Sequence, residues 1–196
     1  ICIIDTGVNS THPGLAGRIV AQKCFCDVSD VGSGGCCPDA TTEDNSATDD
    51  QGHGTHVTGI AAGNGSSITG VAPEASIVAV KVADSAGDAL FSDITLAVNW
   101  CTSNASRYNI SVISISLGGG SYNSACDSDY ASLSSEINTA WNNNVSVVIA
   151  SGNSGYTTNM TAPACINKSI SVSSTTKADA ISSFSNRNAL TDLFAP

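Results

Sequence analysis

The chain alternates short apolar runs, rich in β-branched residues, with amphipathic stretches, and this alternation constrains its fold more than any other feature. Five runs predict buried strands: residues 2–4, 76–82, 111–115, 146–149 and 169–172. Between them, the stretches near residues 57–61, 94–101 and 133–141 carry apolar side chains at helical spacings and predict helices. Strand followed by helix favours an α/β fold: a doubly wound, mostly parallel β-sheet flanked by helices and joined by right-handed crossovers.

Length and local composition add three expectations. With 196 residues, 41% of them hydrophobic, the chain can bury one substantial core, so a single domain over residues 1–196 is expected. Ser92 precedes the second helical stretch and is predicted to cap it. The segment 27–50 is rich in Gly, Ser, Thr, Asp and Cys and predicts a surface loop. All apolar runs are far shorter than the roughly 20 residues that cross a bilayer, so no membrane span is expected.

Charge and cysteine content bear on partners and on the cellular compartment. The net charge of −10 repels nucleic acid and anionic lipid, so neither is an expected partner. Eight cysteines indicate either disulfides in an oxidising compartment or a metal site. Four of them form a C-x-C pair and an adjacent pair within residues 24–37, spacings that fit no standard zinc site and therefore favour disulfides. A secreted or cell-surface protein is expected, and seven N-glycosylation sequons are compatible with it.

Three polar residues stand where an α/β fold gathers its chemistry, beyond the carboxyl ends of the strands or at the start of a helix. Asp5 follows the first apolar run directly, and Asn153 follows the fourth within a glycine-flanked turn. His53 opens the first helical stretch, where the helix N-terminus disfavours the imidazolium and so suits a neutral general base. A carboxylate such as Asp5 could orient that imidazole, and Asn153 could donate to an oxyanion. Each residue also has an ordinary structural explanation when taken alone.

The combination of motifs resembles the subtilisin-like serine protease family, the subtilases. Residues 3–8 (IIDTGV) with 11–13 (THP) are similar to the aspartate motif of the family, and residues 52–57 (GHGTHV) to its histidine motif. The intervening family blocks resemble residues 70–73 (GVAP), 114–118 (SISLG) and 150–153 (ASGN), in the same order. Because the blocks extend along the whole chain, the resemblance covers residues 1–196.

The resemblance implies a serine endopeptidase that hydrolyses peptide bonds with an Asp-His-Ser triad. It implies a polypeptide substrate, a propeptide in the precursor, and a disulfide between Cys126 and Cys165, whose loops would emerge at the same edge of the fold. The implied catalytic residues are Asp5 as orienting acid, His53 as general base and Asn153 as oxyanion donor. The implied substrate-binding residues are Ser116, Leu117 and Gly118, as an edge that pairs with an extended peptide, and Ala150, Ser151 and Gly152, as pocket lining.

The sequence departs from the family pattern in two places. It contains no Gly-Thr-Ser-Met-Ala-like block to present the nucleophile, and residues 192–196 resemble the segment upstream of it. We therefore expect the parent chain to continue and the 196-residue piece to be inactive alone. Gly14 stands where many members place a calcium-binding aspartate. The chemistry needs no cofactor, and a structural calcium is compatible with Asp44, Asp49 and Asp50, although a solvated acidic loop is favoured.

Three other functions compete with an active subtilase. An aspartic protease could use Asp5 in its Asp-Thr-Gly tripeptide, but that chemistry needs two facing carboxylates and an all-β fold. A metal-dependent hydrolase could use Asp5, His53 and His56, although His56 is predicted to be structural. A degenerate subtilase could act as a non-catalytic peptide-binding or structural domain.

Overall fold

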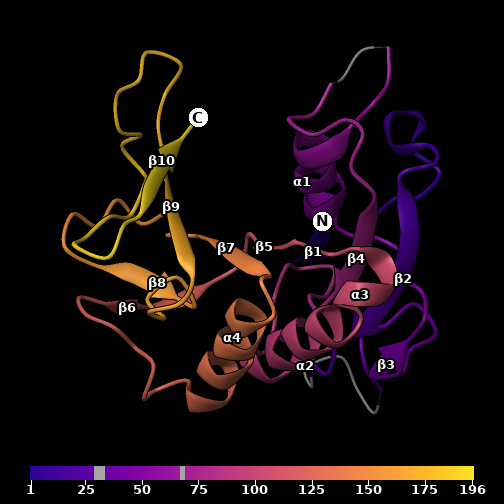
Figure 1. Ribbon diagram of the computed structural model, residues 1–196, viewed down its shortest axis with the longest axis horizontal. Coiled ribbons are helices and arrows are strands. Elements are labelled where there is room, and N and C mark those ends of the chain that lie inside the picture. The colour runs from indigo at the N-terminus through magenta and orange to yellow at the C-terminus, as the bar shows by residue number, and fades with distance from the viewer. Residues whose placement is uncertain (29–33, 67–68) are drawn as a thin grey trace. The chain divides into compact units, whose positions relative to one another are not determined.

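A computed structural model of the protein describes residues 1–28, 34–66 and 69–196 (Figure 1). Contacts among these residues divide the chain into two compact units, Ile1–Ile113 and Ser114–Pro196. Each unit contains parallel strands with helices packed on them, so the predicted α/β class is confirmed, and all five expected strands and three expected helices are present. The single domain over residues 1–196 stays a prediction. Within the described residues, no helix is long and apolar enough to cross a membrane.

Four strands form the sheet of the first unit in the order β1-β4-β2-β3. Strand β1 (Cys2–Asp5) pairs in parallel with β4 (Ile77–Lys81), which pairs in parallel with β2 (Ile19–Phe25). The short strand β3 (Glu43–Asp44) adds antiparallel to β2, within the segment expected to be a loop; residues 29–33 of that segment lie outside the described residues. Every residue of β1 and β4 is buried, as their continuous apolar runs predict.

The helices of the first unit are the 3₁₀ turn η1 (Pro13–Leu15), α1 (His53–Ala62), α2 (Phe91–Ser103) and α3 (Ala105–Tyr108). Helix α1 packs on β1, and α2 packs on β1 and β2. The predicted cap at Ser92 is wrong, because α2 begins at Phe91 and Leu90 occupies the cap position without a side-chain hydrogen bond. Apolar periodicity locates the buried face of a helix but not its first residue, and α2 begins before its first buried apolar residue, Ile94.

Strand β5 (Val112–Ile115) contains the boundary between the units, and the second unit has three parallel strands in the order β7-β9-β10. Helix α4 packs on β7, and a separate antiparallel pair is formed by β6 and β8. The elements of this unit are β6 (Gly119–Tyr122), α4 (Ala131–Asn142), β7 (Ser146–Ala150), β8 (Met160–Ala162), β9 (Ile170–Ser174) and β10 (Leu193–Ala195).

All eight cysteines form disulfides. The predicted bond between Cys126 and Cys165 is confirmed, with Cα atoms 5.4 Å apart. The clustered cysteines pair with one another rather than forming a metal site, and the remaining bond ties β1 to α2. The other three pairs are Cys2–Cys101, Cys24–Cys37 and Cys26–Cys36.

Candidate active site

The end of β1 and the start of α1 bring an acid and an imidazole together. Asp5 is the last residue of β1, and His53 is the first residue of α1. The Nδ1 atom of His53 lies 2.7 Å from Oδ1 of Asp5, so the predicted hydrogen bond is present. The carboxyl is buried, whereas the His53 side chain is 43% exposed. The pair therefore has one anchored partner and one that solvent can reach.

Burial sets the electrostatics of Asp5. Loss of water raises the pKa of the carboxyl, and hydrogen bonds donated by His53 and by the backbone N–H of Thr6 oppose that rise without cancelling it. Both donors converge on Oδ1, the Thr6 nitrogen at 2.7 Å. Among the described residues Oδ2 has no hydrogen-bond partner although it is buried. Ionised Asp5 is thus stabilised mainly through Oδ1, the atom that holds the imidazole.

A glycine allows this close approach of helix and strand end. A Cβ atom built on Gly54 would lie 2.2 Å from the carbonyl oxygen of Gly7 and 3.2 Å from Cβ of Asp5. Any side chain at position 54 would push the first turn of α1 away from the loop that follows β1. Placing His53 against Asp5 therefore requires glycine as the next residue.

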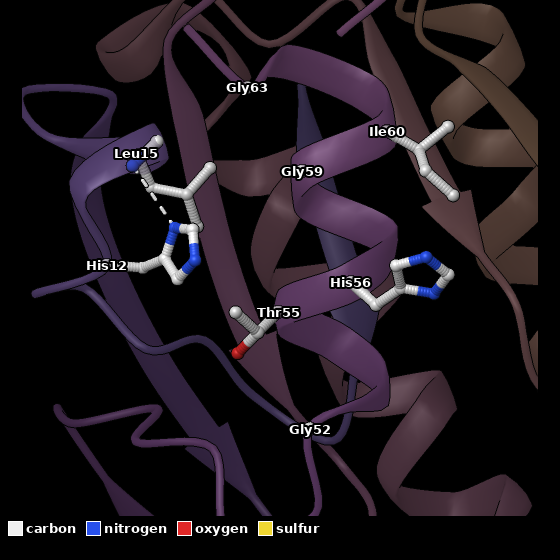
Figure 2. Close-up of a pocket in the computed structure, with 9 residues that line it drawn as sticks. His12, Leu15, Gly52, Thr55, His56, Gly59, Ile60 and Gly63 are labelled. Atoms are coloured by element: carbon white, nitrogen blue, oxygen red, sulfur yellow. Dashed lines mark hydrogen bonds between the residues drawn. The ribbon is translucent and has the colours of Figure 1, made fainter. Parts of the chain in front are cut away.

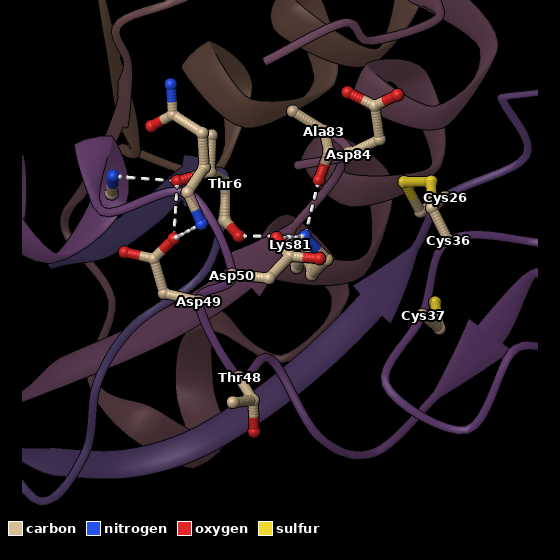
Figure 3. A network of polar contacts seen from close by, with 12 residues as sticks. Thr6, Cys26, Cys36, Cys37, Thr48, Asp49, Asp50, Lys81, Ala83 and Asp84 are labelled. Atoms are coloured by element: carbon tan, nitrogen blue, oxygen red, sulfur yellow. Dashed lines mark hydrogen bonds and ion pairs between the residues drawn. A yellow bond between two sulfur atoms is a disulfide. The ribbon is translucent and has the colours of Figure 1, made fainter. Parts of the chain in front are cut away.

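The carboxylate of Asp49 ties this loop to the first turn of α1 (Figure 3). Its oxygens accept hydrogen bonds from the hydroxyl of Thr6 at 2.9 Å and from the backbone N–H of Gly52 at 2.8 Å. They also accept from the N–H and the hydroxyl of Thr55, at 2.9 and 2.5 Å, and from the N–H of Gln51. Partial burial raises the pKa of Asp49, but these hydrogen bonds outweigh it and lower the pKa to about 2.

The fully buried amine of Lys81 fixes the same loop from the other side (Figure 3). Its Nζ atom donates to the backbone carbonyl of Thr6 at 3.0 Å and to that of Ala83 at 2.6 Å. It also forms an ion pair with Asp50 at 2.7 Å. The hydroxyl of Thr6 also accepts a hydrogen bond from the N–H of Gly54 at 2.8 Å. The carbonyl and the hydroxyl of Thr6 are therefore both held by hydrogen bonds.

The expected solvated acidic loop is wrong for Asp49, whereas Asp50 is exposed to solvent as expected. Asp49 is engaged by five donors, and Asp50 is paired with the buried Lys81. The contacts satisfy the Asp49 carboxylate within the protein, which a sequence pattern of charge cannot reveal. Nowhere in the described parts of the chain do three or more His, Cys, Asp or Glu side chains gather to share a metal ion. The structural calcium stays a prediction.

The second histidine of the GHGTHV motif takes no part in the pair. His56 is exposed on α1 and lines a cavity of about 460 Å³ that also borders His12 and Ile60 (Figure 2). His12 is occupied locally, because its Nδ1 atom accepts from the backbone N–H of Gly14 at 3.1 Å. His56 does not join Asp5 and His53 in a donor cluster, so the zinc arrangement considered as an alternative is not formed by these residues.

The other predicted site residues belong to the second unit. Ala150 ends β7 and is followed by buried Ser151, half-buried Gly152 and exposed Asn153. Residues 116–118 follow β5 and precede β6. Among the described residues, the backbone of this segment makes no hydrogen bond in a loop or turn. The structure thus joins Asp5 to His53 within the first unit and places Asn153 and the two predicted substrate segments in the second.

Sequence reasoning missed several residues that hold these segments. Thr6, Asp49 and Lys81 secure the first unit's site, and Thr161 and Asn186 contact the loop before Asn153 in the second. Asp49 carried one usable signal, since an acid shortly before a helix start often accepts from its free N–H groups. The others carried none, because their roles depend on contacts between residues distant in sequence.

Comparison with known proteins gives a consistent result. The model of the family described as "Subtilase family" matches residues 1–196. The chain is 37% identical to thermitase of Thermoactinomyces vulgaris, and 36% identical to the major intracellular serine protease of Bacillus subtilis; each alignment covers 100% of this chain. A crystal structure of a cold adapted subtilisin-like serine proteinase superposes with a TM-score of 0.76 at 35% identity, covering 100% of this chain.

These matches involve only part of each relative. The chain spans 62% of the length of thermitase, 57% of the Bacillus protease and 61% of the cold adapted proteinase. It therefore corresponds to somewhat less than two thirds of these proteins.

Proposed function

This chain belongs to the subtilase family, and from that premise we propose that it supplies the acid and the base of a serine endopeptidase. The observation that carries the proposal is the 2.7 Å hydrogen bond between Asp5 and His53, formed within the two motifs that resemble the family's aspartate and histidine blocks. The Bacillus subtilis relative and the cold adapted relative are a serine protease and a serine proteinase in name, which supports the same reaction class.

The geometry suits the two residues to distinct roles. An ionised Asp5 accepts a hydrogen bond from the N–H at Nδ1 of His53 and thereby fixes the tautomer in which Nε2 carries no proton. Because the imidazole is 43% exposed, its Nε2 atom is accessible to a serine hydroxyl and to a leaving amine. The buried charge of Asp5 would stabilise the imidazolium formed when His53 takes the serine proton. No metal ion is needed for these steps.

The second unit would supply transition-state stabilisation and peptide binding. Asn153, exposed after β7, would donate its side-chain amide to the oxyanion. Such a donor contributes about 100- to 1,000-fold to kcat, a range known from subtilisin itself, a member of this family. Residues Ser116, Leu117 and Gly118 would pair with an extended polypeptide substrate. Residues Ala150, Ser151 and Gly152 would line the pocket for the residue before the scissile bond.

We propose that the nucleophile is a serine outside these 196 residues, because none of the serines here stands in a Gly-Thr-Ser-Met-Ala-like block. The 196-residue chain alone would then be inactive. We further propose a secreted or cell-surface protease made with a propeptide. Four disulfides favour an oxidising compartment, whereas family membership does not decide, since one relative is named an intracellular protease.

Labelling with a serine-directed fluorophosphonate tests the proposal. We expect the 196-residue chain to remain unlabelled and a longer protein that includes a serine block to be labelled. His53→Ala should abolish labelling of the longer protein, whereas His56→Ala, which changes an exposed histidine three residues away, should not.

Each other outcome contradicts one part of the proposal. Labelling of the short chain at a serine would show that the nucleophile is already present. Labelling that survives His53→Ala would contradict the role of His53 as the general base. A longer protein that folds, contains the serine block and is never labelled would favour a non-catalytic, peptide-binding subtilase.

A further inference from the structure

Asn186, in the segment between β9 and β10, is completely buried in the second unit. A buried carboxamide lowers stability unless its polar atoms find partners. The Oδ1 atom of Asn186 accepts from the backbone N–H groups of Ser154 at 2.9 Å and Tyr156 at 3.1 Å. Its Nδ2 atom donates to the backbone carbonyl of Ser151 at 3.2 Å. Both polar atoms of the side chain therefore bond to the loop that follows β7.

The backbone of Asn186 holds the same loop. Its N–H donates to the carbonyl of Gly152 at 2.9 Å, and its own carbonyl accepts from the hydroxyl of Ser151 at 2.7 Å. The hydroxyl of Ser173, in β9, donates to that same carbonyl at 2.7 Å and so anchors Asn186 to the sheet. Asn186 therefore connects the loop after β7 to the neighbouring strand β9.

Gly152 is shaped to lie against this carboxamide. Its φ angle of +108° is in the region that favours glycine. A Cβ atom at position 152 would lie 2.4 Å from Nδ2 of Asn186 and 2.8 Å from a methyl carbon of Thr161. The backbone immediately before Asn153 consequently rests directly on Asn186, with no room for an intervening side chain.

Asn153 itself lies between the bonded residues but has no bond of its own. Its side chain is exposed, and no hydrogen bond joins it to any other residue in the described chain. Its position is therefore decided by the backbone on either side. That backbone is bonded to Asn186 at Ser151 and Gly152 before it and at Ser154 after it.

We propose that Asn186 is the positioning residue for the oxyanion donor Asn153. The inference rests on the proposed oxyanion role of Asn153. Asn186 is too deeply buried to touch a substrate and acts only through the loop. Donors act on a developing charge at a fixed point in space, and a misplacement of about 1 Å can reduce the rate about 100-fold. Loss of the Asn186 contacts should therefore slow catalysis without removing a group that contacts the reacting atoms.

The test compares Asn186→Ala with Asn188→Ala in the complete protease that contains this chain. Asn188 is a suitable control, because it also makes local hydrogen bonds, to Tyr122 and Leu190, but none to the loop around Asn153. On a saturating peptide substrate, we expect Asn186→Ala to lower kcat at least about tenfold and Asn188→Ala to change it less than about twofold. Amide hydrogen exchange at residues 154 and 156 should accelerate only in Asn186→Ala.

A double mutant separates positioning from general stability. Asn186→Ala in an Asn153→Ala background should change kcat by less than about twofold, because the group being positioned is already absent. Losses that multiply in the double mutant would overturn the inference, as would unchanged kcat with accelerated exchange. Should Asn186→Ala fail to fold, Asn186→Ser, which keeps a hydroxyl at the buried site, gives the same comparison. An Asn153→Ala variant with undiminished kcat would instead refute the proposed oxyanion role, independently of Asn186.

Discussion

Replacing Asp49 by Asn tests whether this carboxylate holds the Asp5–His53 site together. The side chain accepts five hydrogen bonds, and its folded pKa is about 2 against an ordinary 3.8. At roughly 1.4 kcal/mol for each pKa unit, this difference corresponds to about 2.5 kcal/mol. Because the carboxylate is only partly buried, solvent screening reduces that figure, and we expect about 1 to 1.5 kcal/mol of stabilisation.

The sign follows from the lowered pKa. The folded state releases the Asp49 proton more readily than the unfolded state does, so the ionised side chain stabilises the fold. That contribution is fully present above pH 4 to 5 and is lost as the pH falls through 3.8 towards 2. An Asn at position 49 cannot titrate, and its NH₂ group would face N–H donors. The variant should therefore be less stable than the native protein near pH 6, with a gap that narrows on acidification.

Urea unfolding followed by circular dichroism between pH 6 and pH 2.5 measures this gap. Asp179→Asn removes one carboxylate from an exposed position and controls for the change in net charge. We expect the Asp49→Asn gap to shrink by about 1 kcal/mol over this range and the control gap to stay constant. A gap for Asp49→Asn that is equally large at both ends of the range would refute the reasoning.

Three further predictions concern the same fold. Asp5→Asn should lower kcat of the complete protease about 10⁴-fold, the loss typical of this change in a serine protease triad. Because burial raises the pKa of Asp5, ionising this carboxyl lowers the stability of the native protein as the pH rises above 3.8. The variant should therefore gain stability relative to the native protein from pH 3 to 7 in urea unfolding, and parallel pH profiles of the two proteins would contradict this. Lys81→Met should destabilise by about 2 to 4 kcal/mol in urea, since it strips buried carbonyls, that of Thr6 among them, of their donor; a loss below 1 kcal/mol would argue against that role. Replacing both Cys126 and Cys165 by Ser removes a disulfide between residues 39 apart in the sequence. The double variant should lose about 3 to 4 kcal/mol of unfolding free energy in the chain-entropy model, and an unchanged unfolding midpoint would contradict this.

Periodicity and motif order in the sequence determined the fold class and the central pair of the site. The apolar runs predicted β1, β4, β5, β7 and β9. Every residue of β1 and β4 is buried, as continuous apolar runs indicate, whereas buried and half-buried residues alternate in β5, β7 and β9. Strands with mixed character escaped prediction: β2 contains Gln22 and Lys23, and β6 contains two glycines. Their strand conformation depends on pairing with neighbours, which local composition does not encode.

The Asp5–His53 pair was predictable because each residue sits in a contiguous motif whose spacing fixes its place at a strand end or helix start. Only the tertiary structure showed that Asp49, Lys81 and Asn186 hold the loops that follow β1 and β7. Each acts on a loop brought near it by the fold, and its role depends on burial and on distances between atoms far apart in the chain. A buried charge or amide is tolerated only where specific partners meet it, and those partners are assembled by folding, not by sequence neighbourhood.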